Sequence, residues 1–486
     1  MVLDKIDYKK VFAYFEEISQ IPRGSKNNQA ISDYLLKFGK DLGLECRQDE
    51  ALNVVMIKEA SKGLEHVPAI IIQGHMDMVC EKDSDTEHDF YKEGLDLAID
   101  GDYVYAKGTT LGGDDGIALA MAMALVTDDT LELPRMEIIF TTDEEIGMDG
   151  ATALDVSDLK AKYMINIDSE VEGILTVGCA GGMTSTLTLP LERNASAGVR
   201  AKVSIKGLQG GHSGIEITKN RTNGNILLGR LLSQLESRMD YQAITMWGGL
   251  KDNAIVREAF AELVVDGKDA VKLQETVNGL VAIYKAELAT SEPELSIEVE
   301  LDREEKEYPV LTKECLDKVI TVLLFTPNGI QQMSSDIEGL VESSLNLGIF
   351  KMSDNQATFS YSVRSSKSTY KEFMSEKLTR FITMLGGTYS QRGVYPAWEL
   401  KKESRLTQIC KEVYKEQYNE DMVVEVIHAG LECGIISSRM PELDIVSIGP
   451  NMLDIHTPSE RMSISSVKRV YDYVLSVIVA ICRQQS

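Results

Sequence analysis

A chain of 486 residues is longer than one hydrophobic core usually organises, so we expect two or more domains. The formal net charge of −26 argues against binding to nucleic acid or to an anionic membrane surface. The seven cysteines occur without a CxxC pair, which argues against a disulfide framework and a thiolate zinc site. With no signal-peptide core and no apolar run of membrane-spanning length, the expected location is the cytoplasm.

Five apolar runs predict buried strands of an α/β sheet. In chain order they cover residues 67–74, 136–142, 161–168, 174–178 and 443–450. Between the first two runs, the stretch GGDDGIALAMAMALVTDD predicts a well-buried helix that follows a Gly-Asp turn.

The pattern of the sequence changes at about residue 188. From there to about residue 392, alternating strand-like stretches are mixed with amphipathic helical ones such as NRTNGNILLGRLLSQLES. The remaining residues return to an apolar, α/β-like pattern. We therefore predict a catalytic α/β domain in two parts, residues 1–187 and 393–486, interrupted by an inserted α+β domain, residues 188–392.

Metal-binding side chains follow the carboxyl ends of four of these strands, which is the edge where open α/β sheets bind ligands. The residues are His75 and Asp77 in IIIQGHMD, Glu144 and Glu145 in IIFTTDEE, Asp168 in YMINID, and His456 in IVSIGPNMLDIH. Histidine together with carboxylates suits a divalent transition metal, zinc above all. Two histidines and several carboxylates exceed the needs of one zinc ion. They favour two ions that share a carboxylate, with a separate carboxylate to take a proton from water.

Some of these side chains have alternative interpretations. Asp77 is better placed to orient the imidazole of His75 than to bind a metal itself. Taken alone, His456 fits a structural histidine as well as a ligand. His212, in KGLQGGHSGIEI, fits either a surface histidine on a tight hairpin or a donor to a developing oxyanion.

Six motifs, in order along the chain, resemble one known family. They are GHMDMV, LGGDDGIALA, TTDEEIG, INIDSE, GGHSG and HTPSER. They resemble the di-zinc metallopeptidases that include carboxypeptidase G, acetylornithine deacetylase-like enzymes and carnosinase-type dipeptidases. The resemblance covers essentially the whole chain. It implies a catalytic domain with a central mixed sheet flanked by helices, and an inserted lid domain.

The resemblance also implies the metal ligands. Each of two divalent ions would have one histidine, one private carboxylate and a shared bridging carboxylate, Asp114. The histidines are His75 and His456, and the private carboxylates are Glu145 and Asp168. Spacing alone leaves both Asp114 and Asp115 open as the bridge. Zn²⁺ is the expected metal, with Mn²⁺ or Co²⁺ as alternatives.

Further roles follow from the same resemblance. Glu144 resembles the general base, and Asp77 the carboxylate that orients His75. His212 resembles a lid histidine that helps bind the scissile carbonyl, in its own subunit or in a partner's. Three residues lie where relatives contact the terminal carboxylate of the substrate: Arg364, His428 and Glu432.

The expected function is hydrolysis of dipeptides, either Xaa-His or a broad range. An N-acyl amino-acid deacylase could use the same metal site, and only the specificity pocket would distinguish it. A non-catalytic metal-binding protein is the third alternative, and the intact Glu144 argues against it because a structural site needs no base. Small peptides are the expected partners. A homodimer is favoured, although the predicted insert is long enough to cover its own site.

Overall fold

The computed structural model describes residues 2–6 and 8–484. The chain divides into two compact units. Unit 1 contains the described residues up to Cys179 together with Leu400–Val426 and residues from Leu431 onward, and unit 2 contains Ala180–Glu399 and Ile427–Gly430. The predicted boundaries at 188 and 392 fall inside strands of unit 2, and the assignment of separate domains remains a prediction.

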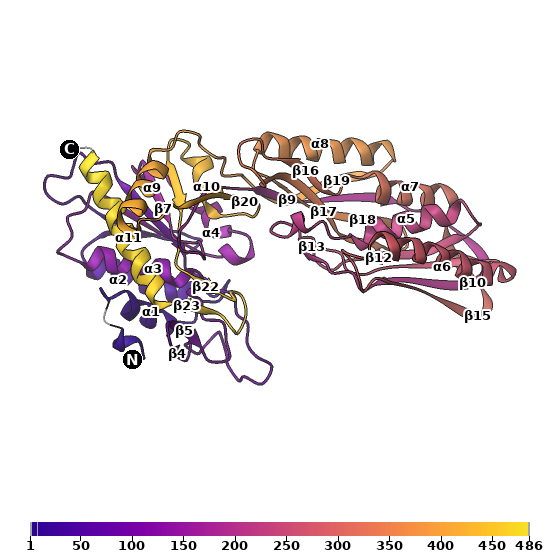
Figure 1. The fold of residues 1–486 in the computed structure, drawn as a ribbon, viewed down its shortest axis with the longest axis horizontal. Helices are drawn as coiled ribbons and strands as arrows, with labels where there is room; N and C mark the ends of the chain where they lie inside the picture. Colours follow the sequence, from indigo (N-terminus) through magenta and orange to yellow (C-terminus); the bar gives the residue numbers. More distant parts are fainter. Residues whose placement is uncertain (1, 7, 485–486) are drawn as a thin grey trace. The chain divides into compact units, whose positions relative to one another are not determined.

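Unit 1 is built around an eight-stranded mixed sheet (Figure 1). In spatial order its strands are β1 (Glu45–Gln48), β2 (Val54–Lys58), β6 (Met136–Thr141), β3 (Ile70–His75), β7 (Tyr163–Asn166), β21 (Asp444–Ser447), β8 (Ile174–Cys179) and β20 (Val423–Ile427). Strand β3 pairs in parallel with β6 and β7, and β21 pairs in parallel with β7, whereas β1, β2 and β6 form antiparallel pairs. Every residue of β3 and β6 is buried, as expected for central strands covered on both faces.

The helices of unit 1 cover both faces of this sheet. They are α1 (Val11–Ser19), α2 (Gln29–Asp41), α3 (Gly113–Thr127), α4 (Asp149–Ala153), α9 (Arg405–Tyr418), α10 (Glu432–Arg439) and α11 (Ile464–Gln484), with short 3₁₀ turns η1 (Leu3–Lys5) and η2 (Glu144–Ile146). A Cβ on Gly74 would meet Ala118 of α3, whereas Gln73 bonds Glu432 of α10. Because neighbouring residues of a strand face opposite sides, α3 and α10 lie on opposite faces of β3.

A smaller antiparallel sheet completes unit 1. Its strands are β22 (Met452–Leu453), β23 (Arg461–Ser463), β5 (Tyr103–Ala106) and β4 (Leu97–Asp100). This small sheet holds both ends of the segment that carries His456.

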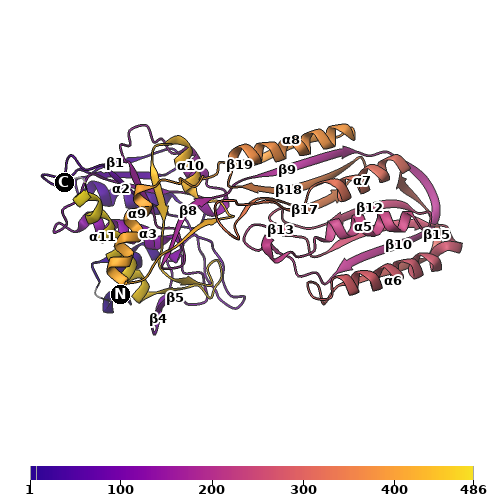
Figure 2. The same cartoon turned by 45° about the horizontal axis from the view of Figure 1, so that its top comes forward.

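Unit 2 is an antiparallel sheet with helices packed on it (Figures 1 and 2). Its strands, in spatial order, are β15 (Ser296–Leu311), β10 (Arg193–Lys206), β14 (Ala259–Val265), β12 (Gln242–Gly248), β17 (Val341–Met352), β18 (Gln356–Ser365), β9 (Gly181–Pro190) and β19 (Thr388–Tyr395), with β16 (Gly329–Met333) on β17. The helices are α5 (Gly224–Glu236), α6 (Ala270–Glu287), α7 (Lys313–Phe325) and α8 (Ser368–Met384), with 3₁₀ turns η3 (Ile217–Lys219) and η4 (Gly267–Asp269). A separate pair joins β11 (Gly211–His212) to β13 (Ala254–Ile255).

One hydrophobic core joins the four helices of unit 2 to its sheet. Alternate residues of β18, including Phe359 and Tyr361, pack with Leu231 of α5, Val319 of α7 and Leu378 of α8. The predicted fold class, an α/β protein with a central mixed sheet flanked by helices, is confirmed. Among the described helices, none combines the length and the apolar character needed to cross a lipid bilayer.

Candidate metal centre

The carboxyl ends of the parallel strands bring the predicted ligands together in unit 1. His75 is the last residue of β3, Glu145 lies on η2 after β6, and Asp168 follows β7. Because these three strands run in parallel, their carboxyl ends share one edge of the sheet. Asp114 enters from the start of α3, and His456 from the connection between β22 and β23.

The first group of possible ligands contains His75, Asp114 and Asp168. Nε2 of His75 lies 3.0 Å from Oδ1 of Asp114 and 3.6 Å from Oδ1 of Asp168. His75 is almost completely buried. These three side chains offer one imidazole nitrogen and two carboxylates, a donor set that suits zinc.

The second group contains Asp114, Glu145 and His456. Nε2 of His456 lies 3.2 Å from Oδ2 of Asp114 and 3.1 Å from Oε2 of Glu145. His456 has a φ of 60°, in the left-handed region that costs a non-glycine residue energy.

Asp114 is the residue that the two groups share. Its Oδ1 faces His75 and its Oδ2 faces His456, so one carboxylate is directed at both groups. Asp115 is placed differently, because its Oδ2 accepts the backbone N–H of His75 at 3.2 Å beneath the sheet edge. The geometry therefore favours Asp114 over Asp115 as a bridging ligand.

The pKa values of the possible ligands are shifted because several ionisable side chains lie close together in a buried site. Burial opposes ionisation of Asp114, but hydrogen bonds to His456 and His75 hold its pKa below the usual range. Burial raises the pKa of Asp168 to about 6, and the nearby carboxylates Asp114 and Glu145 add to the rise. Bonds to Asp114 and Glu145 raise the pKa of His456 to about 11.

The donor set fits bound cations. Three carboxylates converge at one place, where positive charge would offset their mutual repulsion. Within the described residues, the buried Oε1 of Glu145 has no hydrogen-bond partner, although such atoms are nearly always satisfied. Two histidines and three carboxylates arranged around one shared aspartate would complete two sites of three protein ligands each.

Glu144 and Asp77 lie directly beside the first group. The Asp77 carboxylate accepts the backbone N–H of Glu144 at 3.1 Å and the hydroxyl of Ser25 at 2.8 Å, and lies 3.4 Å from Nδ1 of His75. Asp77 therefore contacts both a predicted ligand and the predicted base. Burial raises the pKa of Glu144 well above its usual value, and Asp168 and Glu432 raise it further.

Sequence analysis assigned no role to two further residues near this centre. Arg23 and Glu460 are both buried and bind the backbone that carries His75 and Asp114. Glu460 lies in HTPSER, four residues after His456, and that short spacing is a signal in the sequence. Arg23 lies in a turn between α1 and α2, where nothing in the local pattern marks it.

Three of the remaining predicted residues lie together in unit 2. A Cβ on Gly214 would meet the carbonyl oxygen of His428, Cε1 of His212 and Nε of Arg364, so these residues surround one glycine. Nδ1 of His212 lies 3.2 and 3.1 Å from the backbone N–H groups of Gly214 and Ile215, which places the ring proton on Nε2. Burial lowers the pKa of His212, and Arg364 lowers it further.

The fourth residue, Glu432, is fully buried in unit 1. Its Oε2 accepts hydrogen bonds from Nε2 of Gln73 and the hydroxyl of Thr141, each at 2.6 Å. The predicted substrate contacts of Arg364, His428 and Glu432 remain predictions.

A cavity of about 620 Å³ in unit 1 opens beside Glu145. Its wall includes Ser25, Met78, Phe90, Tyr91 and Ile146. This volume is within the range of small-molecule sites.

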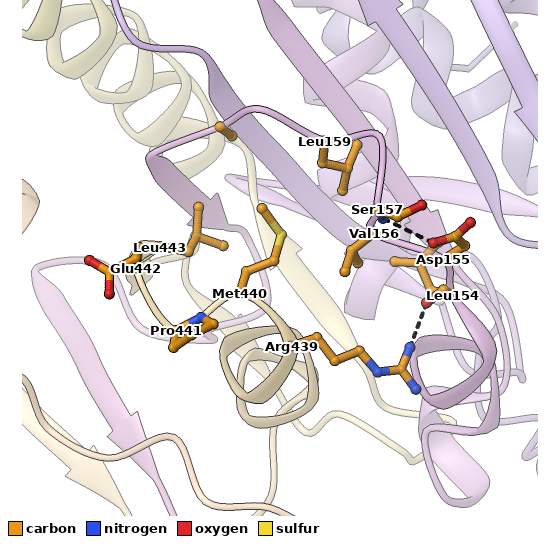
Figure 3. A pocket seen from close by; sticks show the side chains of 11 residues that line it. Leu154, Asp155, Val156, Ser157, Leu159, Arg439, Met440, Pro441, Glu442 and Leu443 are labelled. Atoms are coloured by element: carbon orange, nitrogen blue, oxygen red, sulfur yellow. Dashed lines mark hydrogen bonds between the residues drawn. The ribbon is translucent and has the colours of Figure 1, made fainter.

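Another hollow in unit 1 lies away from the ligands (Figure 3). Its lining residues lie within 154–161 and 439–443, which precede β7 and β21, so the hollow lies at the amino ends of these strands. Figure 3 shows Arg439 extending toward the carbonyl oxygen of Leu154, with which it forms a hydrogen bond of 2.5 Å. Ligand sites of open α/β sheets form at the opposite edge, where the candidate metal centre lies.

Comparison with protein families matches residues 71–480 to the peptidase family M20/M25/M40. The chain belongs to this family. The family resemblance inferred from the six motifs is therefore confirmed. Among curated M20 relatives, the chain is 37% identical to the cytosol non-specific dipeptidase of Escherichia coli (strain K12) over 467 residues, 96% of each protein.

Two solved structures resemble this chain over almost its full length. The crystal structure of aminoacylhistidine dipeptidase from Vibrio alginolyticus matches with a TM-score of 0.88 and 34% identity, over 97% of this chain and 96% of that one. The phrases GHMDMVCEK, HAGLECG and IGPNM resemble the same enzyme. Aminopeptidase PepT from Bacillus cereus shares the fold, with a TM-score of 0.56 and 16% identity over 97% of this chain and 98% of that one.

Proposed function

We propose that this chain is a metal-dependent dipeptidase that hydrolyses dipeptides with a free N-terminus. The observation that carries the proposal is the shared carboxylate of Asp114, which belongs to both groups of possible ligands. Two matched groups around one aspartate are the arrangement that a two-metal hydrolase needs.

His75, Asp114 and Asp168 would hold one ion, and Asp114, Glu145 and His456 the other, with Zn²⁺ preferred over Mn²⁺ or Co²⁺. Bound at such a site, divalent ions polarise a carbonyl oxygen and lower the pKa of water.

Glu144 performs the proton transfers in this proposal. It takes a proton from the attacking water as the water oxygen bonds to the scissile carbonyl carbon. It then gives the proton to the amine nitrogen as the carbon–nitrogen bond breaks. Asp77 holds the backbone N–H of Glu144, which keeps the base beside the first group. The role implied for His212, binding the scissile carbonyl, remains a prediction.

The preference for dipeptides is supported by the relatives that match almost the full length of the chain, since both are named as dipeptidases. The cavity beside Glu145 has room for a side chain of a short peptide. The name of the E. coli relative also supports a cytosolic location. The homodimer remains a prediction, which light scattering of the purified protein would test.

A panel of substrates tests the proposal after chelation and return of Zn²⁺, Mn²⁺ or Co²⁺. We expect metal-restored hydrolysis of dipeptides, including Xaa-His, and little hydrolysis of tripeptides or N-acetylated amino acids. Preference for the acetylated compounds would instead identify a deacylase. Full activity in the chelated protein would contradict the metal-dependent mechanism.

A further inference from the structure

We propose that Arg23 and Glu460 are positioning residues that direct the two oxygens of Asp114 toward His75 and His456. The inference rests on the proposed function, because it concerns how the same metal centre is held. Neither residue belongs to the possible ligand groups.

Glu460 binds the backbone immediately before Asp114. Its Oε2 accepts the N–H groups of Leu111 at 2.8 Å and Gly112 at 3.0 Å, and its Oε1 accepts that of Gly113 at 2.8 Å. Hydrogen bonds from several donors to a buried carboxylate are strong, because the acceptor carries a charge. These bonds tie the segment that carries His456 to the segment that carries Asp114.

Arg23 binds the same segment through a carbonyl oxygen. Its Nη2 donates to the carbonyl oxygen of Gly112, and its Nη1 donates to those of Met76 at 3.1 Å and Asp77 at 3.2 Å. The guanidinium therefore ties the segment after His75 to the segment before Asp114. Its planar fork holds its donors in a fixed geometry, which the compact ammonium group of lysine does not reproduce.

Gly112 is bound from both sides by this pair. Its N–H donates to Glu460 and its carbonyl accepts from Arg23, while its φ of 62° lies in the left-handed region. A Cβ on Gly112 or Gly116 would come within 2.5 Å of Nη2 of Arg23. Gly112 and Gly116 of LGGDDG therefore leave space for Arg23.

These contacts concern ligand geometry because Asp114 is the next residue but one after Gly112. Its two oxygens lie 3.0 Å from His75 and 3.2 Å from His456, so a small rotation of the backbone would misdirect at least one of them. Arg23 and Glu460 together join the His75, Asp114 and His456 segments at one peptide group. A substitution of Arg23 or Glu460 removes no possible ligand from the chain. It should make the orientation of the Asp114 carboxylate less fixed.

Titration of the metal-free protein with Mn²⁺, followed by electron paramagnetic resonance, tests this inference. The wild type should bind two ions per chain and show the exchange coupling of a carboxylate-bridged pair. Glu460→Gln and Arg23→Lys should bind at least one ion about 10- to 100-fold more weakly and lose the coupling. Far-UV circular dichroism should show that both metal-free variants are folded.

Glu137→Gln is the matched control. Glu137 is also fully buried and accepts backbone N–H groups, those of Lys160 at 3.0 Å and Ala161 at 3.2 Å, but it lies at the amino end of β6. This change should lower the melting temperature and leave both ions and their coupling unaltered. A merely structural role for Arg23 and Glu460 predicts the same result for all three variants.

The outcomes separate this inference from the proposed function. If the wild type fails to bind two coupled Mn²⁺ ions, the positioning inference is wrong, and the substrate panel with returned Zn²⁺, Mn²⁺ or Co²⁺ decides the proposed function separately. If the wild type binds two and Glu460→Gln and Arg23→Lys do so with unchanged affinity and coupling, only the positioning role is wrong. If Glu460→Gln does not fold, the metal titration of Arg23→Lys tests the positioning role, because this variant keeps a positive charge at the buried site.

Discussion

Asp143, Glu144 and Glu145 are consecutive in the sequence but have three different environments. Asp143 accepts hydrogen bonds from the backbone N–H of Lys26 at 2.6 Å and from Asn28 at 2.8 Å, which anchors the turn. Glu144 lies beside Asp77, and Glu145 faces His456. A left-handed φ of 56° at Asp143 turns the chain after β6, so the three side chains diverge. One strand end can therefore supply an anchor, a base and a ligand.

Glu144→Gln should lower kcat by about 10²–10⁴-fold, because the amide cannot accept the proton from water. Since Glu144 is outside both ligand groups, metal content should stay at the wild-type value. Kinetics on a dipeptide and metal analysis of the same sample check both expectations. Asp143→Asn is the control and should retain most activity. Equal losses in the two variants would contradict the assignment.

The buried Glu432 should make the stability of the metal-free protein depend on pH. Burial raises its pKa from 4.5 to about 7, so the folded state binds the proton more tightly than the unfolded state. The resulting stabilisation is complete below about pH 4.5 and is lost as the pH rises through about 7. Between pH 5 and pH 8, the wild type should lose about 2–3 kcal/mol of unfolding free energy more than Glu432→Gln. Urea unfolding in the presence of a chelator measures this difference. The same dependence of the unfolding free energy on pH in the wild type and in Glu432→Gln would refute the prediction.

At the scale of elements, β3 positions the centre because it is held between α3 and α10. A Cβ at Gly74 would lie 2.4 Å from Cβ of Ala118 and 2.5 Å from Oδ2 of Asp115. This close approach lets Asp115 reach the backbone N–H of His75. The almost uniformly apolar α3 is buried along most of its length, which explains its lack of a polar face.

Gly74→Ala should therefore destabilise unit 1 by about 1–3 kcal/mol through overpacking. Gly279→Ala, on the exposed side of α6, is the matched change, since nothing lies within 4 Å of the added carbon. It should stabilise unit 2 by about 0.5–1 kcal/mol because alanine favours the helix. Denaturant unfolding of both variants measures whether the unfolding free energy falls for Gly74→Ala and rises for Gly279→Ala. A stabilising Gly74→Ala would show that β3 and α3 can separate at little cost.

At the scale of the whole molecule, the two units have separate cores, and the possible ligand groups found among the described residues lie in unit 1. Both tryptophans of the sequence, Trp247 and Trp398, lie in unit 2. Tryptophan fluorescence therefore reports on unit 2, whereas far-UV circular dichroism reports on both units.

Removing the metal should lower the melting temperature of unit 1 by about 5–10 °C, because binding stabilises only the folded site. The circular dichroism transition should shift on chelation, while the fluorescence transition should shift much less. Thermal melts of one sample with both probes test this. Identical shifts would show that the units unfold together, and no shift would argue against metal in unit 1.

The sequence by itself determined five strands of the mixed sheet, one buried helix and the candidate ligands. Periodicity and apolar runs predicted β3, β6, β7, β8, β21 and α3, because burial imposes a pattern on neighbouring residues. The motifs identified His75, Asp114, Glu145, Asp168 and His456 as a set, and the structure brings these five together. Patterns of neighbouring residues are enough to predict a buried strand or a ligand motif, because both depend on residues that are close together in the sequence.

Only the tertiary structure decided which atoms meet. It separated Asp114 from Asp115, placed Glu432 inside unit 1, and revealed Arg23 and Glu460 against the backbone of the metal centre. Arg23 and Glu460 lie more than four hundred positions apart in the sequence, yet they bind the same peptide group, the one between Gly112 and Gly113. Such contacts depend on strand order and on the packing of α3, and no pattern of neighbouring residues encodes them.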